Sequence, residues 1–232
     1  MDGEISGLSS MATRPVLAEL TEHIRLARGL AVRFESAGGV EIARWVRAGA
    51  ESDVLVLAEG ALAGLAEEGY VLGDSLRPLW VSQVVAAVPE GTRVPALRSE
   101  SDLRAALLSA QRIAYSTGPS GTALVDLITR LDLAGALGDR LVQAPPGVPA
   151  GSLLSSGGAD LAFQQHSELM DLPGVAVVGP LPGDHAISST FGGGVLAVSS
   201  RPRRAREVLD FLGSGPASKT ARAKGMRAFG DR

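Results

Sequence analysis

Short β-branched runs alternate with helical segments along most of this chain, and that alternation restricts it to α/β folds with largely parallel strands. Residues 53–57 give the clearest strand, because their unbroken Val-Leu-Val-Leu run is typical of a strand buried on both faces. Leu17, Leu20 and Ile24 recur three and four residues apart, which predicts a helix with one apolar face. We therefore expect mainly parallel sheets flanked by helices.

The pattern occurs twice, which predicts two lobes. Long apolar strands at residues 81–88 and 191–198 separate the two series, and we interpret them as hinge strands that cross between the lobes. Residues 1–80 together with 191–232 then form a discontinuous lobe 1, and residues 81–190 form lobe 2. A two-lobed layout predicts a ligand cleft between the lobes, because ligands prefer domain interfaces.

Composition excludes several classes of function. The 232 residues contain no cysteine, so thiol nucleophiles, Fe–S clusters and cysteine-type zinc sites are absent. His23, His166 and His185 form no histidine-pair motif, so we expect no metal and no cofactor. An aromatic content of 4% and a net charge of −3 argue against a nucleic-acid partner.

The chain also lacks the apolar segments that membranes require. Its best apolar run, residues 54–66, is shorter than the roughly 18 residues needed to span a bilayer and contains Glu59. The first residues, Met1 to Glu4, are acidic and do not have the basic start of a secretory signal. As written, the chain is expected in the cytoplasm, and in the periplasm only if its start was trimmed from a precursor.

Four loops share one property: each follows an expected strand, is rich in Ser, Thr, Gly or Pro, and precedes an expected helix. Such loops lie at the carboxyl ends of parallel strands, where ligands bind. A helix N-terminus there offers unpaired N–H groups and a partial positive charge to an anion. For any single loop, a helix cap is the simpler interpretation of its serine; with four such loops in a two-lobed layout, a cap and an anion site are equally good interpretations. The loops comprise residues 9–11, 36–39, 116–122 and 145–149.

Better-known nucleotide and hydrolase motifs do not fit these loops. Residues 118–122, Gly-Pro-Ser-Gly-Thr, have no lysine before the hydroxyl and miss the spacing of a P-loop. They also miss the GxSxG spacing of a hydrolase nucleophile, because Gly121 follows Ser120 directly. No GxGxxG follows the first strand, so a dinucleotide cofactor is not expected.

The loop sequences resemble those of type II periplasmic binding proteins of the molybdate-binding (ModA-like) superfamily, over nearly the whole chain. That resemblance implies a two-lobed α/β fold, each lobe a mainly parallel sheet flanked by helices, with two hinge strands and an oxyanion bound between the lobes. The carrying segments are LSSMATR at 8–14, SAGGV at 36–40, DVLVL at 53–57, YSTGPSGT at 115–122, APPGVP at 144–149 and FQQHSEL at 163–169.

By motif position, the resemblance implies that serines Ser10 and Ser36 bind the anion, with main-chain donors near Ser120 and Val148. A tyrosine usually completes a molybdate site, and this chain has residues 164–166, Gln-Gln-His, where the tyrosine is expected. The full set of candidate ligand-binding residues is Ser9, Ser10, Met11, Arg14, Ser36, Gly38, Gly39, Ser116, Thr117, Ser120, Gly121, Thr122, Val148, Gln164 and Gln165.

Three functions remain open. The first is a solute-binding protein for a small oxyanion or carboxylate, as monomer or homodimer, with a transporter as possible partner. The fold resemblance also includes citrate-type binders and aconitate isomerase, and Arg14 and Gln165 suit a di- or tricarboxylate. An isomerase would move a proton, with His166 as base and Tyr115 as acid. A cytoplasmic ligand sensor would need a separate partner chain, because no DNA-binding extension is present.

Overall fold

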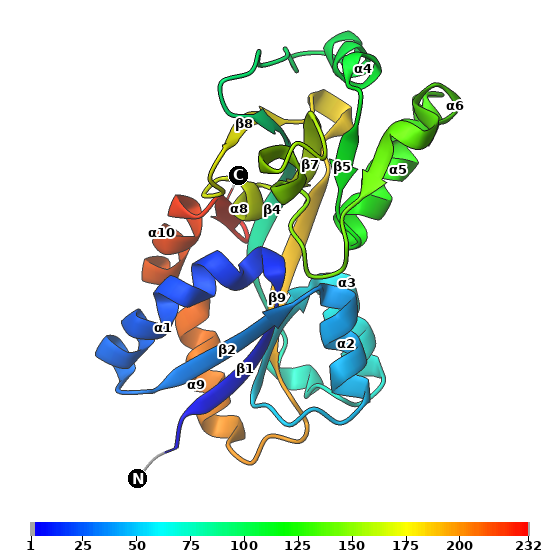
Figure 1. Ribbon diagram of the computed structural model, residues 1–232. Helices are drawn as coiled ribbons and strands as arrows, with labels where there is room; N and C mark the ends of the chain where they lie inside the picture. Colours follow the sequence, from blue (N-terminus) through cyan, green and yellow to red (C-terminus); the bar gives the residue numbers. More distant parts are fainter. Residues whose placement is uncertain (1–2, 232) are drawn as a thin grey trace. The chain divides into compact units, whose positions relative to one another are not determined.

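The computed structural model describes residues 3–231 and divides the chain into two compact units (Figure 1). Unit 1 comprises Met1–Ser82 and Ser189–Arg232, and unit 2 comprises Gln83–Ser188. The chain leaves unit 1 within strand β4 (Arg77–Pro89) and returns at the start of β9 (Ser188–Val195). The two-lobed α/β class expected from the sequence is confirmed.

Unit 1 is built on three parallel strands, each followed by a helical segment. Strand order is β2–β1–β3–β9, in which β9 runs antiparallel to β3, and β10 pairs antiparallel with β4. The elements are β1 (Ile5–Ser10), η1 (Met11–Thr13), α1 (Arg14–Arg28), β2 (Val32–Ala37), α2 (Gly39–Arg47), β3 (Val54–Ala58), α3 (Glu59–Glu67), η2 (Gly73–Ser75), α9 (Pro202–Leu212), α10 (Gly215–Ala223) and β10 (Met226–Ala228).

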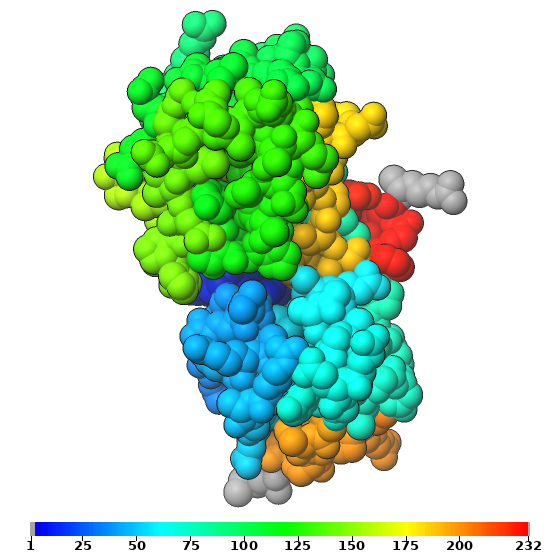
Figure 2. Space-filling model, turned by 90° about the vertical axis from the view of Figure 1, so that its right-hand side faces the viewer, coloured from blue at the N-terminus to red at the C-terminus, as the bar shows by residue number. Residues whose placement is uncertain are grey.

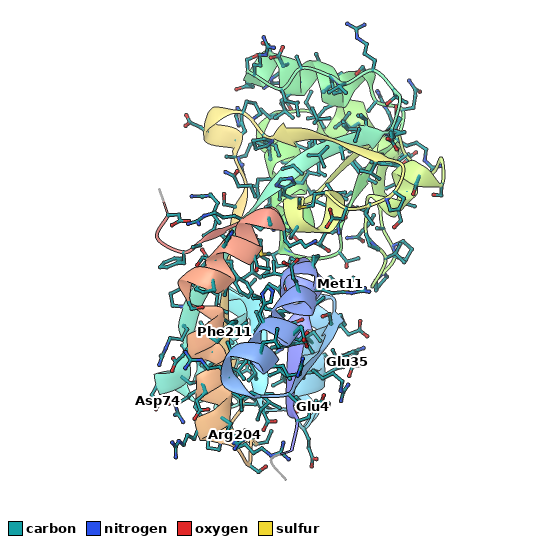
Figure 3. All side chains as sticks on the ribbon, turned by 90° about the vertical axis from the view of Figure 1, so that its left-hand side faces the viewer. Glu4, Met11, Glu35, Asp74, Arg204 and Phe211 are labelled. Carbon is teal, nitrogen blue, oxygen red and sulfur yellow. The ribbon has the colours of Figure 1, made fainter. Side chains whose placement is uncertain are left out.

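Helices cover both faces of the unit 1 sheet. Leu17, Leu20 and Ile24 of α1 are fully buried against one face, together with residues of α9 and α10 (Figure 3). The predicted apolar face of this helix is confirmed. On the other face, α2 and α3 lie side by side (Figure 2). Their buried residues Ile42 and Leu65 belong to one apolar cluster. The sheet is therefore buried on both sides, as its continuous apolar β3 strand requires.

Unit 2 repeats this plan with β6, β5 and β7 parallel and β4 antiparallel to β7. Strand β8 pairs antiparallel with β4. The elements are α4 (Glu100–Ser109), β5 (Ile113–Tyr115), α5 (Pro119–Arg130), α6 (Ala134–Leu137), η3 (Gly138–Arg140), β6 (Leu141–Gln143), α7 (Ser152–Ser155), β7 (Leu161–Gln165), α8 (His166–Leu169), β8 (Val175–Pro180) and η4 (Gly183–His185).

Two corrections concern the sheets. They are mixed rather than mainly parallel, because β4 and β9, the strands that link the units, run antiparallel to their neighbours. The last long strand also lies at Ser188–Val195 instead of residues 191–198, so it begins with the polar residues that precede its glycines. A Cβ on Gly193 would lie 2.5 Å from Leu209 Cδ2, which explains a glycine run inside a strand.

Among residues 3–231, the structure has no helix that is both long enough and apolar enough to cross a membrane.

Candidate functional site

Two serine hydroxyls meet at the carboxyl ends of β1 and β2 in unit 1. The register pairs Ser9 with Ser36, and their Oγ atoms lie 2.7 Å apart in a hydrogen bond. Ser9 is fully buried and Ser36 is half-buried. One hydroxyl of the pair donates to the other, so the second O–H can still donate to a ligand. The structure thus brings together two of the predicted site residues.

Ser10 lies beside this pair but does not cap the helical segment that follows it. It occupies the N-cap position of η1 without a side-chain hydrogen bond to the backbone. Thr13 Oγ1 instead donates to the Ser10 carbonyl oxygen at 3.0 Å and lies 3.5 Å from Ser10 Oγ. Thr13 is fully buried and was missed by the sequence analysis. Its position three residues after Ser10 could have indicated the contact, because a residue three positions on lies next to Ser10 in a helical turn. Met11 begins η1 and is half-buried (Figure 3).

Helix α2 begins at the same strand ends with two glycines. Gly38 is its N-cap and Gly39 its first residue, and both are half-buried. The first helical hydrogen bond runs from Ile42 N to Gly38 O, so the N–H groups before Ile42 have no acceptor within the helix. A Cβ on Gly39 would meet only ordinary contacts near 4.0 Å. These donors carry the partial positive charge of a helix N-terminus.

Arg14 adds a cation next to the serine pair. It is the first residue of α1, its side chain is exposed, and it borders a cavity of about 460 Å³ that Ser36 also lines. Glu35 of β2, labelled in Figure 3, also lines this cavity. Arg33, which also lines it, is paired with Glu4 at 3.4 Å. The remaining lining residues are Leu17, Ala18, Thr21, Val32 and Phe34.

In unit 2, a second hydroxyl pair marks the start of α5. Ser116 Oγ and Ser120 Oγ lie 3.0 Å apart, and Ser120 is buried. Gly118 is the N-cap, and its carbonyl accepts from Gly121 N at 2.9 Å and Thr122 N at 3.2 Å. A Cβ on Gly121 would overlap the Ser116 carbonyl oxygen, so this position requires glycine. Thr117 and Thr122 are exposed at the same loop.

The capping interpretation of these serines is wrong in this structure. Helices α2 and α5 and segment η1 begin without a side-chain cap. Elsewhere the chain does form such caps: Ser99 accepts from Asp102 N at the start of α4, and Ser214 accepts from Ala217 N at the start of α10. Hydroxyls at the strand ends are therefore paired with one another, while the adjacent helix N-termini keep their donors.

Two candidates in unit 2, Val148 and Gln164, already form hydrogen bonds within the protein. Val148 N–H, which the resemblance assigns to the anion, donates to Pro145 O at 3.0 Å and closes a turn. Gln164 is buried, and its Oε1 accepts from Gly151 N at 3.3 Å. Its Nε2 donates to Glu168 Oε1 at 2.8 Å. Gln165, also buried, points to the opposite face of the sheet because side chains alternate along β7.

Glu168 is the functional candidate that sequence reasoning missed. It lies on α8, is half-buried, and burial raises its pKa to about 7 despite the hydrogen bond from Gln164, which lowers it. Gln164 belongs to strand β7 and Glu168 to helix α8, so no helical spacing in the sequence predicts their contact. The carboxyl can therefore gain or lose a proton near neutral pH.

The two candidate catalytic residues differ in their surroundings. His166 is half-buried at the start of α8, and burial lowers its pKa, so the imidazole is neutral at pH 7 and can accept a proton. Tyr115 is half-buried at the end of β5 and packs against the apolar core of unit 2. Both residues belong to unit 2.

Two α/β units with donor-rich loops at the strand ends are typical of a ligand-binding protein. Residues 5–227 match the family described as bacterial extracellular solute-binding protein, and the chain belongs to that family.

Comparison with known proteins agrees with this assignment. The chain is 31% identical over 179 residues to an aconitate isomerase from Pseudomonas sp., covering 76% of this chain and 67% of that protein. Among solved structures it resembles the periplasmic molybdate-binding protein of Azotobacter vinelandii, with TM-score 0.81, 20% identity, and coverage of 96% and 98% of the two chains. The sulfate-binding protein of Mycobacterium tuberculosis gives TM-score 0.81, 16% identity and coverage of 99% and 88%. The resemblance to type II periplasmic binding proteins is thus confirmed.

Proposed function

We propose that this protein binds a small anion, an oxyanion or a carboxylate, through hydrogen-bond donors in its strand-end loops. In unit 1 these donors are the hydroxyls of Ser9, Ser10 and Ser36 and the N-terminus of α2. In unit 2 they are the Ser116–Ser120 pair and the N-terminus of α5. The supporting observation is that hydrogen-bonded hydroxyl pairs lie at the strand ends beside the N-termini of α2 and α5, neither of which has a side-chain cap.

Neutral donors suffice for this function. A hydrogen bond to a charged group contributes about 1.5–3 kcal/mol net, so around six of them outweigh the several kcal/mol lost on association. Donors of this kind avoid the desolvation cost of a buried lysine.

Arg14 favours a di- or tricarboxylate over a compact tetrahedral anion. Its guanidinium borders the cavity that Ser36 lines, and a guanidinium binds a carboxylate through two parallel hydrogen bonds. A ligand with a second carboxylate could use this cation while the serine pair binds the first. The similarity to aconitate isomerase, a protein named for a tricarboxylate, supports the same choice.

Replacing Ser10 and Ser36 together by alanine tests the site. Thermal unfolding of the wild type is first followed with molybdate, tungstate, sulfate, phosphate, citrate and both aconitate isomers. A ligand at 100 times its dissociation constant stabilises the fold by about 2.7 kcal/mol. We expect the double variant to bind the selected anion at least tenfold more weakly, because two hydroxyl donors are lost. Unchanged affinity in the double variant would contradict the site.

Ser101→Ala provides the matched control. Ser101 Oγ also forms a hydroxyl pair, with Ser99 at 2.8 Å, but it lies on α4 in an exposed position. This variant should bind the anion as the wild type does.

A second candidate function is isomerisation of an unsaturated tricarboxylate by proton transfer. The neutral imidazole of His166 favours it, because a base must take a proton from one carbon and return it to another. We expect wild-type protein to interconvert cis- and trans-aconitate and His166→Ala to bind aconitate without interconverting it. Chromatography of the two isomers after incubation measures this. No interconversion by the wild type would reject the enzyme and leave the binding protein.

Family membership also bears on location and partner. The family is described as extracellular, which supports a place outside the cytoplasm over the cytoplasmic one expected from the sequence as written. A membrane transporter is the partner that such a location implies.

A further inference from the structure

The carboxyl of Glu168 is a titratable group that the proposed donor set does not use. It lies on α8 of unit 2, which follows β7 directly at the strand end where ligand-binding loops gather. The residue as a whole is half-buried, and Gln164 Nε2 is hydrogen-bonded to one of its two carboxyl oxygens.

A chain of two hydrogen bonds fixes which oxygen of Glu168 is occupied. Gly151 N donates to Gln164 Oε1, so the Gln164 amide cannot turn over without placing its NH₂ group against another donor. Its Nε2 must then donate to Glu168 Oε1, at 2.8 Å. Oε1 is therefore an acceptor, and Oε2 is the oxygen that carries a proton when the carboxyl is neutral.

No charge on the neighbouring elements compensates this carboxyl. Helix α8 packs against β7 and β8 and lies next to α7, and none of these three elements contains an ionisable side chain. Residues 144–151, which lead into α7, contain none either. On α8 itself His166 is kept neutral at pH 7 by burial, and Asp171 just beyond it is another acid. A carboxylate here would face an arriving anion with only one hydrogen bond to support its charge.

We propose that Glu168 takes up one proton when the anion binds, so that the ligand meets a neutral carboxyl whose Oε2–H can donate to it. The proton comes from solvent: the carboxylate, one proton and the anion combine to form the protonated complex, and release reverses the step. This inference rests on the proposed anion binding. The raised pKa of Glu168, about 7, means that this proton is easily gained near neutral pH.

The sign of the pH dependence follows from this step. Below pH 7 the carboxyl is already protonated, so affinity should hardly vary with pH. Above pH 7 each bound anion must bring a proton, so affinity should fall by up to tenfold per pH unit.

Isothermal titration calorimetry on the full chain tests the proposal. Trans-aconitate or molybdate, whichever the thermal-shift screen selects, is fully ionised at pH 8 and adds no proton of its own. Titrations in two buffers of different ionisation enthalpy give the number of protons taken up. We expect close to one proton for the wild type at pH 8. Glu168→Gln should take up none and should bind with an affinity that does not change between pH 6 and pH 8.

Glu90→Gln is the matched control, because Glu90 is an exposed glutamate of unit 2 at the turn after β4. It should take up a proton as the wild type does. Binding without proton uptake by the wild type would overturn the inference and leave the proposed function intact. Uptake that persists in Glu168→Gln would also overturn it, because another group would then carry the proton. If none of the screened anions binds, the proposed function fails and this inference with it.

Discussion

Gly121→Ala is expected to abolish anion binding and to lower the free energy of unfolding by about 2 kcal/mol. The added methyl group would overlap the carbonyl oxygen of Ser116, which belongs to the backbone and cannot rotate away. The first turn of α5 must then move away from Ser116, and the pairing of its hydroxyl with Ser120 is lost. Urea unfolding measures the stability change, and calorimetry with the selected anion measures binding.

Gly118→Ala separates this effect from a general sensitivity of the loop. Gly118 lies three residues earlier, its φ of −85° suits any residue, and a Cβ there would meet nothing within 4 Å. This variant should keep nearly wild-type stability and affinity. If Gly121→Ala binds as well as Gly118→Ala does, the start of α5 is not part of the site.

Glu168→Gln is expected to stabilise the folded protein at pH 8 by about 2 kcal/mol, a figure that allows for solvent screening at its partly exposed side chain. The glutamine oxygen can still accept from Gln164, so the hydrogen bond survives while the cost of a buried charge disappears. Unfolding by urea at several pH values measures the difference between variant and wild type.

The sign of this pH dependence is set by the two pKa values of Glu168. Burial raises the pKa in the folded state to about 7 from 4.5, so the folded state keeps a proton that the unfolded chain has already released. Wild-type stability from this group therefore falls as pH rises from 4.5 to 7 and then stays constant. The advantage of Glu168→Gln should be small near pH 4.5 and complete above pH 7. An advantage that is equal at both pH values would show that folding does not raise the pKa of Glu168.

The sequence by itself determined the apolar faces of several elements and the positions of the loops. The apolar spacing of Leu17, Leu20 and Ile24 is a local pattern, and it was confirmed because burying one face of a helix requires apolar residues three and four apart. The continuous apolar run of β3 was confirmed because a strand buried on both faces has apolar residues at every position. The serine- and glycine-rich loops could be placed at strand ends because each follows one apolar run and precedes another.

Tertiary structure alone decided what each polar side chain does. Ser9 and Ser36 are 27 residues apart, and only the register of β1 on β2 makes them a hydrogen-bonded pair. The side-chain amide of Gln164 could donate to an anionic ligand, but in the structure it forms hydrogen bonds with Gly151 and Glu168 instead. The pKa of Glu168 depends on uncharged neighbours from separate elements. Sequence patterns record which residues are buried, whereas the partner of a buried polar group is fixed by strand pairing between distant segments.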